Sequence, residues 1–551
     1  MPFTTEQPQD LCDSYRAEGL WTDRLLTDFL ESAVERSPDK IAVVDERFEP
    51  ITYKELAKQV SRLAAALQAQ GIGRGDRFII ALPNWQHVTI FMLALGYLGA
   101  VAVHIPIAGR EHEFGGVLKV TEAKGIVVAS EFRGFSYVEL IDGIADDHTS
   151  LTTRITVGSA SDDPGWIGYE RLLAEAPADA PQAGEPVTPS DLMYLVFTSG
   201  SSGEPKGVMH SSNTLGAMNS GVAPIYDLGP DDVIFTAAPL GFSGGLVHGV
   251  RLALFLGSTV VLLESWDAER ALELMVREKA AFTILIPTLL RDLLDCPQFP
   301  NYADQLSLRV ILCGGAYVTE DLLRLAREKL PSTLTSVIWG MTEGIGTGSR
   351  PDTPKEKLVT TDGRPFLGTQ LKVLRQDDSE AATGEQGSLV MRGPQRFLGY
   401  FNRPELDEEM FLESGWFRTG DIGSIDEDGY LKISGREKEI IIRGGANISV
   451  AEIEAVLVGD PRIDQLAIVD VPDERLGERL CACVVPKESD NKLSLDDITA
   501  IASKQGLAKY KWPEYLEIMD TLPLSPAGKI QRPTLKEIVL KRMSSTDTAH
   551  G

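Results

Sequence analysis

A loop rich in glycine and hydroxyl side chains has the clearest capacity for chemistry in this sequence. It follows an apolar stretch at 193–198 and reads Thr198-Ser199-Gly200-Ser201-Ser202-Gly203-Glu204-Pro205-Lys206-Gly207. Its glycines allow backbone N–H groups to approach an anion, its hydroxyls add donors, and Lys206 adds a positive charge. The spacing excludes a Walker A loop. We expect a phosphate-binding loop and not a mobile linker, because a predicted strand leads directly into it.

A second motif, Gly241-Phe242-Ser243-Gly244-Gly245, matches the Gly-x-Ser-x-Gly nucleophile elbow of serine hydrolases. A hydrolase of that type needs an acid and then a histidine later in the chain. Only His248 and His550 follow Ser243, the first on the same predicted helix and the second in a polar tail. Neither suits a triad base, so the sequence favours a glycine-rich pocket wall.

Four further segments place polar residues beside glycines. They are Trp339-Gly340-Met341-Thr342-Glu343, Phe417-Arg418-Thr419-Gly420-Asp421, Gly435-Arg436-Glu437-Lys438-Glu439 with Gly444-Gly445-Ala446-Asn447-Ile448, and Leu522-Pro523-Leu524-Ser525-Pro526-Ala527-Gly528-Lys529-Ile530. With the loop at 198–207, they resemble in type and order the motifs of the adenylate-forming superfamily, which includes acyl-CoA synthetases and aryl acid–AMP ligases. The resemblance covers roughly residues 20 to 540. Ser525 for the usual Thr and Val450-Ala451 for the usual Pro are mild departures.

The resemblance implies a two-step reaction with ATP, Mg²⁺ and coenzyme A (CoA). A carboxylate attacks the α-phosphorus of ATP, which gives acyl-AMP and pyrophosphate, and a thiol then displaces AMP. A carboxylate is a poor electrophile, and adenylation makes it a good one. Because the first step brings two anions together, it needs cations and hydrogen-bond donors.

The resemblance also implies a role for each matching residue. Thr342 would donate to the phosphates, and Glu343 would help to hold Mg²⁺, which prefers oxygen ligands. Trp339 would stack on adenine, Asp421 would accept from both ribose hydroxyls, and Arg436 would add a ribose contact. The full set expected to bind ATP or AMP is Thr198, Ser199, Gly200, Ser201, Ser202, Gly203, Lys206, Gly314, Gly315, Ala316, Trp339, Gly340, Met341, Thr342, Asp421 and Arg436.

Lys529 is the residue expected to act most directly, together with Thr342 and Glu343. The resemblance implies that it bridges the attacking carboxylate and the α-phosphate. Lys438 occupies the hinge position, so the predicted domains are 1–437, for adenylation, and 438–551, a mobile lid. Rotation there would present Lys529 for adenylation and then turn Gly444 and Gly445 toward a pantetheine tunnel for CoA.

The acid itself is less well specified. Phe242 stands where many relatives have a gating His or Trp, and the small residues Ser243, Gly244 and Gly245 leave room for a ring. No Asp lies between Pro239 and His248 to pair with an amino group, which argues against an amino acid. We expect an aryl or alicyclic carboxylate, with a medium-chain fatty acid as the alternative.

Two alternatives concern the reaction. No carrier domain follows Lys529, so the acceptor thiol belongs to another molecule. That molecule is free CoA or, as the alternative, a separate carrier protein loaded by a stand-alone aryl acid–AMP ligase. An inactive relative that only binds nucleotide is disfavoured, because Lys206, Glu343, Asp421 and Lys529 are all present.

The elements that must position these motifs alternate along the chain. Apolar strands are predicted at 41–45 and 78–82 and helices at 26–36 and 53–70, and the same rhythm returns at 233–339. This alternation indicates an α/β fold, with sheets layered by helices in a large N-terminal domain. The texture after 394, with shorter segments and hairpin turns, indicates a small α+β C-terminal domain.

Composition limits the binding partners and the cellular compartment that we expect. The 551 residues include 53 Lys and Arg against 80 Asp and Glu, a net charge of −27. Such a surface disfavours nucleic acid and anionic membranes. The apolar run 91–108 is broken by Gly96, Gly99 and Pro106, so we expect a buried helix and strand and no membrane span. Five scattered Cys and no signal peptide indicate a cytoplasmic protein. The anionic ligands then require a locally positive site.

Overall fold

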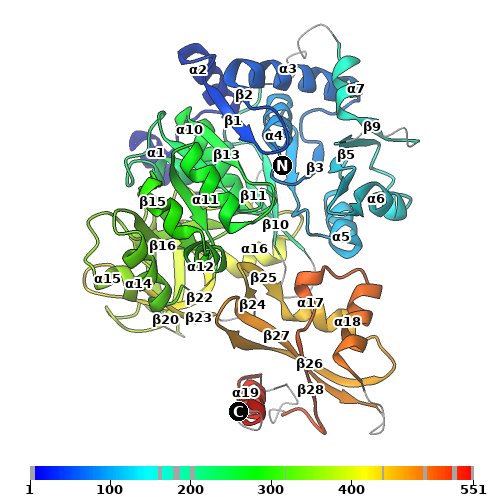
Figure 1. The fold of residues 1–551 in the computed structure, drawn as a ribbon, viewed down its shortest axis with the longest axis vertical. Helices are drawn as coiled ribbons and strands as arrows, with labels where there is room; N and C mark the ends of the chain where they lie inside the picture. Colours follow the sequence, from blue (N-terminus) through cyan, green and yellow to red (C-terminus); the bar gives the residue numbers. More distant parts are fainter. Residues whose placement is uncertain are drawn as a thin grey trace. The chain divides into compact units, whose positions relative to one another are not determined.

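The computed structural model describes residues 7–158, 164–177, 186–198, 205–316, 318–375, 377–436, 440–487, 493–523, 530 and 532–547. The chain divides into two compact units. Figure 1 shows the path of the chain and labels many of its helices and strands. Unit 1 comprises Met1–Ile107, Leu118–Phe197 and Gly207–Glu437. Unit 2 comprises Ala108–Val117, Thr198–Lys206 and Lys438–Gly551. The predicted hinge residue, Lys438, lies outside the described residues.

Two large sheets organise unit 1. The nine-stranded sheet has the order β18-β17-β16-β15-β14-β12-β13-β1-β2 and is parallel from β16 to β1. Its strands are β18 (Arg364–Pro365), β17 (Gly344–Gly348), β16 (Leu334–Met341), β15 (Val310–Gly314), β14 (Ala280–Leu285), β12 (Val233–Thr236), β13 (Thr259–Leu262), β1 (Ile41–Asp45) and β2 (Ile51–Thr52). The α/β class predicted from the sequence is therefore confirmed.

The eight-stranded sheet has the order β21-β11-β10-β4-β3-β5-β8-β9. Its strands are β21 (Gly399–Tyr400), β11 (Lys206–His210), β10 (Tyr194–Thr198), β4 (Val101–His104), β3 (Arg77–Ala81), β5 (Gly125–Ala129), β8 (Thr153–Val157) and β9 (Ile167–Gly168). A short hairpin, β6 (Glu131–Phe132) and β7 (Phe135–Ser136), follows β5. Parallel strands run from β10 to β9, so their carboxyl ends meet along one edge.

Helices connect these strands. They are α1 (Gln9–Ala17), α2 (Leu26–Arg36), α3 (Tyr53–Ala69), α4 (Gln86–Leu98), α5 (Glu111–Thr121), α6 (Tyr137–Ala145), α7 (Tyr169–Ala174), α8 (Ser212–Val222), α9 (Ser243–Gly245), the π-helix η1 (Leu246–Arg251), α10 (Leu252–Leu256), α11 (Ala268–Arg277), α12 (Pro287–Asp295), α13 (Phe299–Tyr302), η2 (Ala303–Gln305), α14 (Glu320–Lys329), α15 (Lys357–Thr360), α16 (Pro404–Met410) and η3 (Glu413–Gly415). One core cluster unites Leu272, Leu290 and Leu322 of α11, α12 and α14 with Phe235 and Ile311 of the nine-stranded sheet.

The apolar run at 91–108 forms the expected helix and strand. Helix α4 is buried over most of its length and ends at Gly99, whose φ of +68° is a left-handed C-cap. Strand β4 then enters the eight-stranded sheet between β3 and β10. In the described part of the chain, no helix is both long and apolar enough to cross a bilayer.

A smaller antiparallel sheet completes unit 1. Its order is β19-β20-β22-β23, with β19 (Gln370–Leu374), β20 (Gly387–Arg392), β22 (Phe417–Ile425) and β23 (Leu431–Arg436). The turn Asp426–Gly429 joins β22 to β23, as the sequence predicts. Asp426 caps this turn by accepting from the backbone N–H of Asp428 and Tyr430. In the register of this pair, Asp421 stands opposite Arg436.

Unit 2 carries a sheet of order β25-β24-β27-β26, with β28 parallel beside β27. Its elements are β24 (Ile440–Arg443), β25 (Ala446–Ser449), α17 (Val450–Leu457), β26 (Ile463–Asp473), β27 (Gly477–Pro486), α18 (Leu495–Lys504), η4 (Lys509–Lys511), β28 (Tyr515–Ile518) and α19 (Arg532–Asp547). Cys481 and Cys483 are both fully buried on β27, on one face as their spacing predicts.

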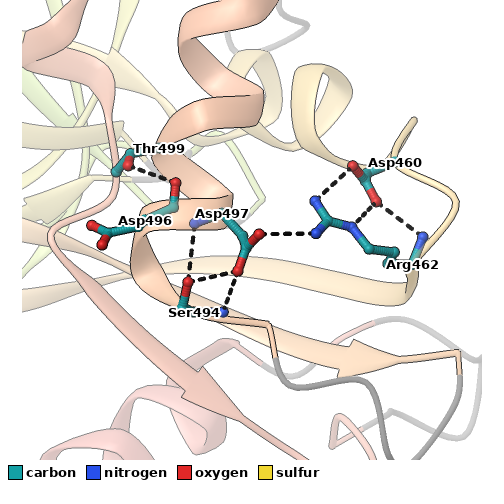
Figure 2. Close-up of polar contacts among 6 residues, drawn as sticks. All are labelled: Asp460, Arg462, Ser494, Asp496, Asp497 and Thr499. Carbon is teal, nitrogen blue, oxygen red and sulfur yellow. Dashed lines mark hydrogen bonds and ion pairs between the residues drawn. The ribbon is translucent and has the colours of Figure 1, made fainter.

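A charged network fixes helix α18 in unit 2, and Figure 2 shows its geometry. Arg462 donates from Nε and Nη2 to Asp460 at 2.9 and 3.2 Å, and from Nη1 to Asp497 at 2.9 Å. Ser494 and Asp497 form a reciprocal capping box at the start of α18. The hydrogen bonds from Ser494, and then Arg462, lower the pKa of Asp497 to about 2. We interpret the network as structural, because it joins the segment before β26 to the N-terminus of α18.

Candidate active site

The Thr342-Glu343 pair forms the turn between β16 and β17, at the carboxyl end of a parallel strand. Ligands of open α/β sheets bind at such ends. The Thr342 hydroxyl lies 3.4 Å from that of Ser243, and the Thr342 carbonyl lies 2.8 Å from Nε2 of His210. Three segments remote in sequence therefore meet at Thr342.

Glu343 has a well-defined partner. It is buried, at 6% exposure, and its Oε1 accepts a hydrogen bond from the Tyr400 hydroxyl at 2.7 Å. Burial, and then the charge of Glu343, raises the pKa of Tyr400 well above its usual value, so Tyr400 remains a donor. The Phe397 backbone N–H donates to the Glu343 carbonyl at 3.0 Å. Both ends of the glutamate are thus held in place.

Trp339 and Asp421 meet beside this turn. The Trp339 indole N–H donates to Oδ2 of Asp421 at 2.9 Å, and both side chains are buried. The indole lies so close to Gly346 that a Cβ there would sit 2.0 Å from the ring. The backbone N–H of Asp421 donates to the Thr419 hydroxyl at 3.1 Å, which fixes the main chain at this position. The residues expected to contact adenine and ribose are therefore neighbours.

Two glycines at the end of β15, Gly314 and Gly315, are required for different reasons. A Cβ at Gly314 would lie 2.3 Å from the Ile338 carbonyl, so strand packing alone requires a glycine there. Gly315 has a φ of +80° and is exposed, and Ala316 is half-buried. Gly315 and Ala316 are thus available to a ligand at the end of β15, whereas Gly314 has a structural role.

The glycine-rich segment at 241–245 is a tight turn leading into a helix. A Cβ at Gly241 would lie 2.5 Å from the Pro106 Cα, and one at Gly245 would lie 2.4 Å from the Ala238 carbonyl. Phe242, Ser243 and Gly244 are half-buried and begin α9. The following run is partly π-helix, which the periodicity did not predict; such turns are frequent at functional sites.

Several expected site residues fall outside the described part of the chain. Ser199–Gly203, Lys438 and Lys529 lie in such segments, as does the side chain of Arg436. Thr198 ends β10 and Lys206 begins β11, so the two ends of the phosphate loop lie on neighbouring strands. In unit 2, Gly444 and Gly445 form a two-residue hairpin turn with φ of +54° and +83°, a conformation that favours glycine.

Comparison with known proteins agrees with this geometry. The family model described as AMP-binding enzyme matches residues 30–401, and that of the AMP-binding enzyme C-terminal domain matches residues 452–529. The chain belongs to the AMP-binding enzyme family. It is therefore a member of the adenylate-forming superfamily of acyl- and aryl-CoA ligases, which are acid–thiol ligases, and the superfamily predicted from the sequence is confirmed.

Individual relatives match along nearly the whole chain. A medium-chain fatty-acid–CoA ligase of Escherichia coli is 34% identical over 96% of this chain and 93% of the relative. A 2,3-dihydroxybenzoate–AMP ligase of Bacillus subtilis is 30% identical over 98% of each. The structure of a double mutant of o-succinylbenzoate CoA synthetase from B. subtilis aligns with a TM-score of 0.79 and 26% identity, over 94% of this chain and 99% of that one. The predicted large N-terminal and small C-terminal domains are thereby confirmed.

In this AMP-binding enzyme, three buried residues at or near the site were not predicted from the sequence. Tyr400 holds Glu343, His210 contacts Thr342, and Arg251 lies on η1. None belongs to a local pattern, since each contact joins distant segments. A weak signal existed for Arg251, because apart from His248 it is the one polar side chain in the run 246–256.

Proposed function

We propose that this enzyme is an ATP-dependent carboxylic acid–CoA ligase that acts on an aryl or alicyclic acid. In its first half-reaction, a carboxylate oxygen of the acid bonds to the α-phosphorus of ATP, and pyrophosphate leaves. In its second, the CoA sulfur bonds to the acyl carbon, AMP leaves, and the thiol proton is lost. The convergence of Ser243, Thr342 and Glu343 at one strand end is the observation that carries the proposal.

The residues described fit the proposed nucleotide. Asp421 offers a carboxylate to the ribose hydroxyls, with its orientation set by Trp339. Thr342 offers a hydroxyl, and Gly315 leaves backbone exposed at the end of β15. Buried donors and acceptors fixed in this way need no reorganisation when charge develops in the transition state.

A bound Mg²⁺ would supply positive charge to the transferring phosphates. Mg²⁺ is commonly held by one or two carboxylates together with substrate phosphates. Glu343 fits that role, because it is a buried carboxylate oriented by Tyr400. No cluster of three or more His, Cys, Asp or Glu suited to a metal occurs in the described ranges, so the nucleotide would provide the other ligands.

The ring-bearing acid is supported by the short side chains at the start of α9 and by the aromatic-acid relatives. A medium-chain fatty acid remains the second candidate, because the E. coli relative named for that activity is 34% identical. Free CoA is the proposed acceptor. Relatives named as AMP ligases favour a separate carrier protein as the alternative acceptor.

An acid panel tests the proposal. Purified full-length enzyme is mixed with ATP and Mg²⁺ and with benzoate, salicylate, cyclohexanecarboxylate, octanoate or decanoate, and pyrophosphate release is measured with and without CoA. We expect release with ring acids and acyl-CoA by mass spectrometry. Faster turnover of octanoate would favour the fatty-acid alternative, and acyl-AMP without acyl-CoA would favour a carrier. ATP binding with no release for any acid would overturn the enzyme reaction.

The role proposed for Lys529 gives the first mutational prediction. We expect Lys529→Ala to slow acyl-AMP formation by about 100-fold or more, because one transition-state donor contributes on that scale. The same variant should still transfer preformed acyl-AMP to CoA. The control is Lys504→Ala, which removes an exposed lysine on α18. An equal loss in both half-reactions would contradict the assigned role.

A further inference from the structure

Arg251 is a fully buried cation for which the described residues supply no acidic partner. It is 1% exposed, and its Nη1 donates to the Tyr194 hydroxyl at 2.8 Å. None of the ion pairs in the described part of the chain includes it, and its Nε is buried without a hydrogen-bond partner. A guanidinium is a strong base, and a buried charge without an ionic partner destabilises a fold. Within the described residues, its contacts are the Tyr194 hydroxyl and the Tyr194 ring, whose centroid is 4.9 Å from Cζ, so its remaining N–H is a candidate donor to a bound ligand.

Two buried imidazoles beside Arg251 are also incompletely bonded. Among the residues that the structure describes, His104 finds no hydrogen-bond partner for either ring nitrogen, and His248 finds none for Nδ1. His104 stands opposite Val196 on β10, two residues after Tyr194, so strand alternation places Tyr194 and His104 on one face of the sheet. Burial, and then the charge of Arg251, lowers the pKa of His104 to about 3, so His104 adds no positive charge at neutral pH.

This cluster adjoins the site already described. Arg251 and His248 lie on the π-helix that continues directly from Ser243 and Gly244. The pKa of His210 is lowered to about 4, chiefly by burial; the hydrogen bond to the Thr342 carbonyl opposes the shift, and the charge of Arg251 adds to it. His210 itself contacts Thr342. Thr342 is therefore linked to Arg251 in two ways: by the electrostatic effect of Arg251 on His210, and by the helical run that leads from Ser243 to Arg251.

We propose that Arg251 binds a second oxygen group of the substrate, a carboxylate or carbonyl remote from the carboxylate that is adenylated. The inference rests on the proposed function, because it assigns the deep end of the same acyl pocket. A guanidinium with an unused N–H suits such an oxygen, and the neutral imidazoles of His104 and His248 can accept or donate beside it. The natural acid would then be a ring-bearing keto acid or dicarboxylic acid.

Matched acids test this inference. The probes are benzoate against benzene-1,3- and benzene-1,4-dicarboxylate and 3- and 4-acetylbenzoate, and cyclohexanecarboxylate against its 1,4-dicarboxylate. The readout is kcat/KM for pyrophosphate release. We expect at least one acid with a second oxygen group to exceed its parent by about 100-fold, because sites built to bond a polar group reject analogues that lack it.

The variant Arg251→Met then distinguishes recognition from structure. It should remove most of that preference, and the ratio of the two acids is independent of the fraction of enzyme that folds. Arg251→Gln provides a second variant, and Arg270→Met, which removes a partly exposed arginine of α11, should leave the ratio unchanged. The inference is overturned if the parent acids reach the same kcat/KM as their substituted analogues and if the ratio of these values is unaltered in both Arg251 variants. The proposed ligase activity would remain supported by that result. Absence of release for every acid would reject the ligase and, with it, this inference.

Discussion

At the scale of single residues, Tyr400 is expected to tune the site through Glu343 without touching the substrate. Tyr400→Phe keeps the ring and removes the hydroxyl that donates to Glu343 at 2.7 Å. Loss of a partner that orients a metal ligand costs about 10- to 100-fold in metal affinity or activity. We therefore expect adenylation to fall about 10-fold and half-saturation by Mg²⁺ to move to higher concentration.

The Mg²⁺ titration separates this role from a structural one. The matched control is Tyr97→Phe, because Tyr97 is 43% exposed and lies on α4. The control should retain both the rate and the Mg²⁺ dependence. A Tyr400→Phe enzyme with a lower rate but an unchanged Mg²⁺ half-saturation would show that the hydroxyl does not act through the metal site proposed at Glu343.

Residues of the site differ in how far the sequence could predict them. Thr342, Glu343 and Asp421 stand in short motifs, so their neighbourhood in sequence reveals them. Tyr400 and Arg251 do not, since their partners are 57 residues away and the signal is a three-dimensional contact. Gly314 shows a different limit: its motif predicts a nucleotide contact, and the structure adds a second reason for glycine there, the nearby Ile338 carbonyl, which the sequence does not reveal.

At the scale of elements, the turn that leads into α9 must be tight. Alanine substitutions at two adjacent glycines of this turn test that requirement. A Cβ at Gly245 would lie 2.4 Å from the Ala238 carbonyl, which is backbone and cannot rotate away. We expect Gly245→Ala to lower the free energy of unfolding by about 1–3 kcal/mol, the usual cost of overpacking. Urea denaturation followed by tryptophan fluorescence measures it.

Gly244→Ala is the matched control. A Cβ there would meet only the Ile284 Cδ1 atom, at 3.7 Å, which is ordinary contact. The free energy of unfolding should change little, while the preference among acids should shift toward smaller rings if Gly244 lines the acyl pocket. Equal destabilisation by both substitutions would contradict the clash argument.

Periodicity predicted the regular elements well, and local geometry explains where it failed. Helix α2 and strand β1 have the predicted bounds, and α3 differs by one residue. Their apolar faces repeat at the period of the element and are buried. The π-helix at Leu246–Arg251 was predicted as ordinary helix, because one extra residue per turn leaves the apolar pattern of a fully buried segment unchanged.

At the scale of the whole molecule, buried titratable groups couple stability to pH. Burial lowers the pKa of His87 and His104 to about 3 and that of His210 and His248 to about 4. The unfolded chain therefore binds more protons at these positions below about pH 6.5, so their contribution to stability is lost as pH falls. Burial raises the pKa of Asp45 and Asp407 to about 6, and these two carboxyls oppose the trend.

The balance of these groups sets the slope of the free energy of unfolding against pH, which can be measured. Near pH 5, four imidazoles favour protonation of the unfolded state and two carboxyls favour that of the folded state. The difference of about two protons lowers the free energy of unfolding by roughly 3 kcal/mol per pH unit on acidification.

The variant His87→Leu tests one part of this slope. It replaces an imidazole whose ring centroid lies 4.6 Å from those of Phe48 and Tyr169, and it should reduce the slope by about 1.4 kcal/mol per pH unit. Urea titrations at pH 5.0, 5.5 and 6.0 measure it, and from pH 7 to 8 the two enzymes should show parallel stabilities. An unchanged slope in the variant would mean that His87 is protonated equally in both states, despite its burial.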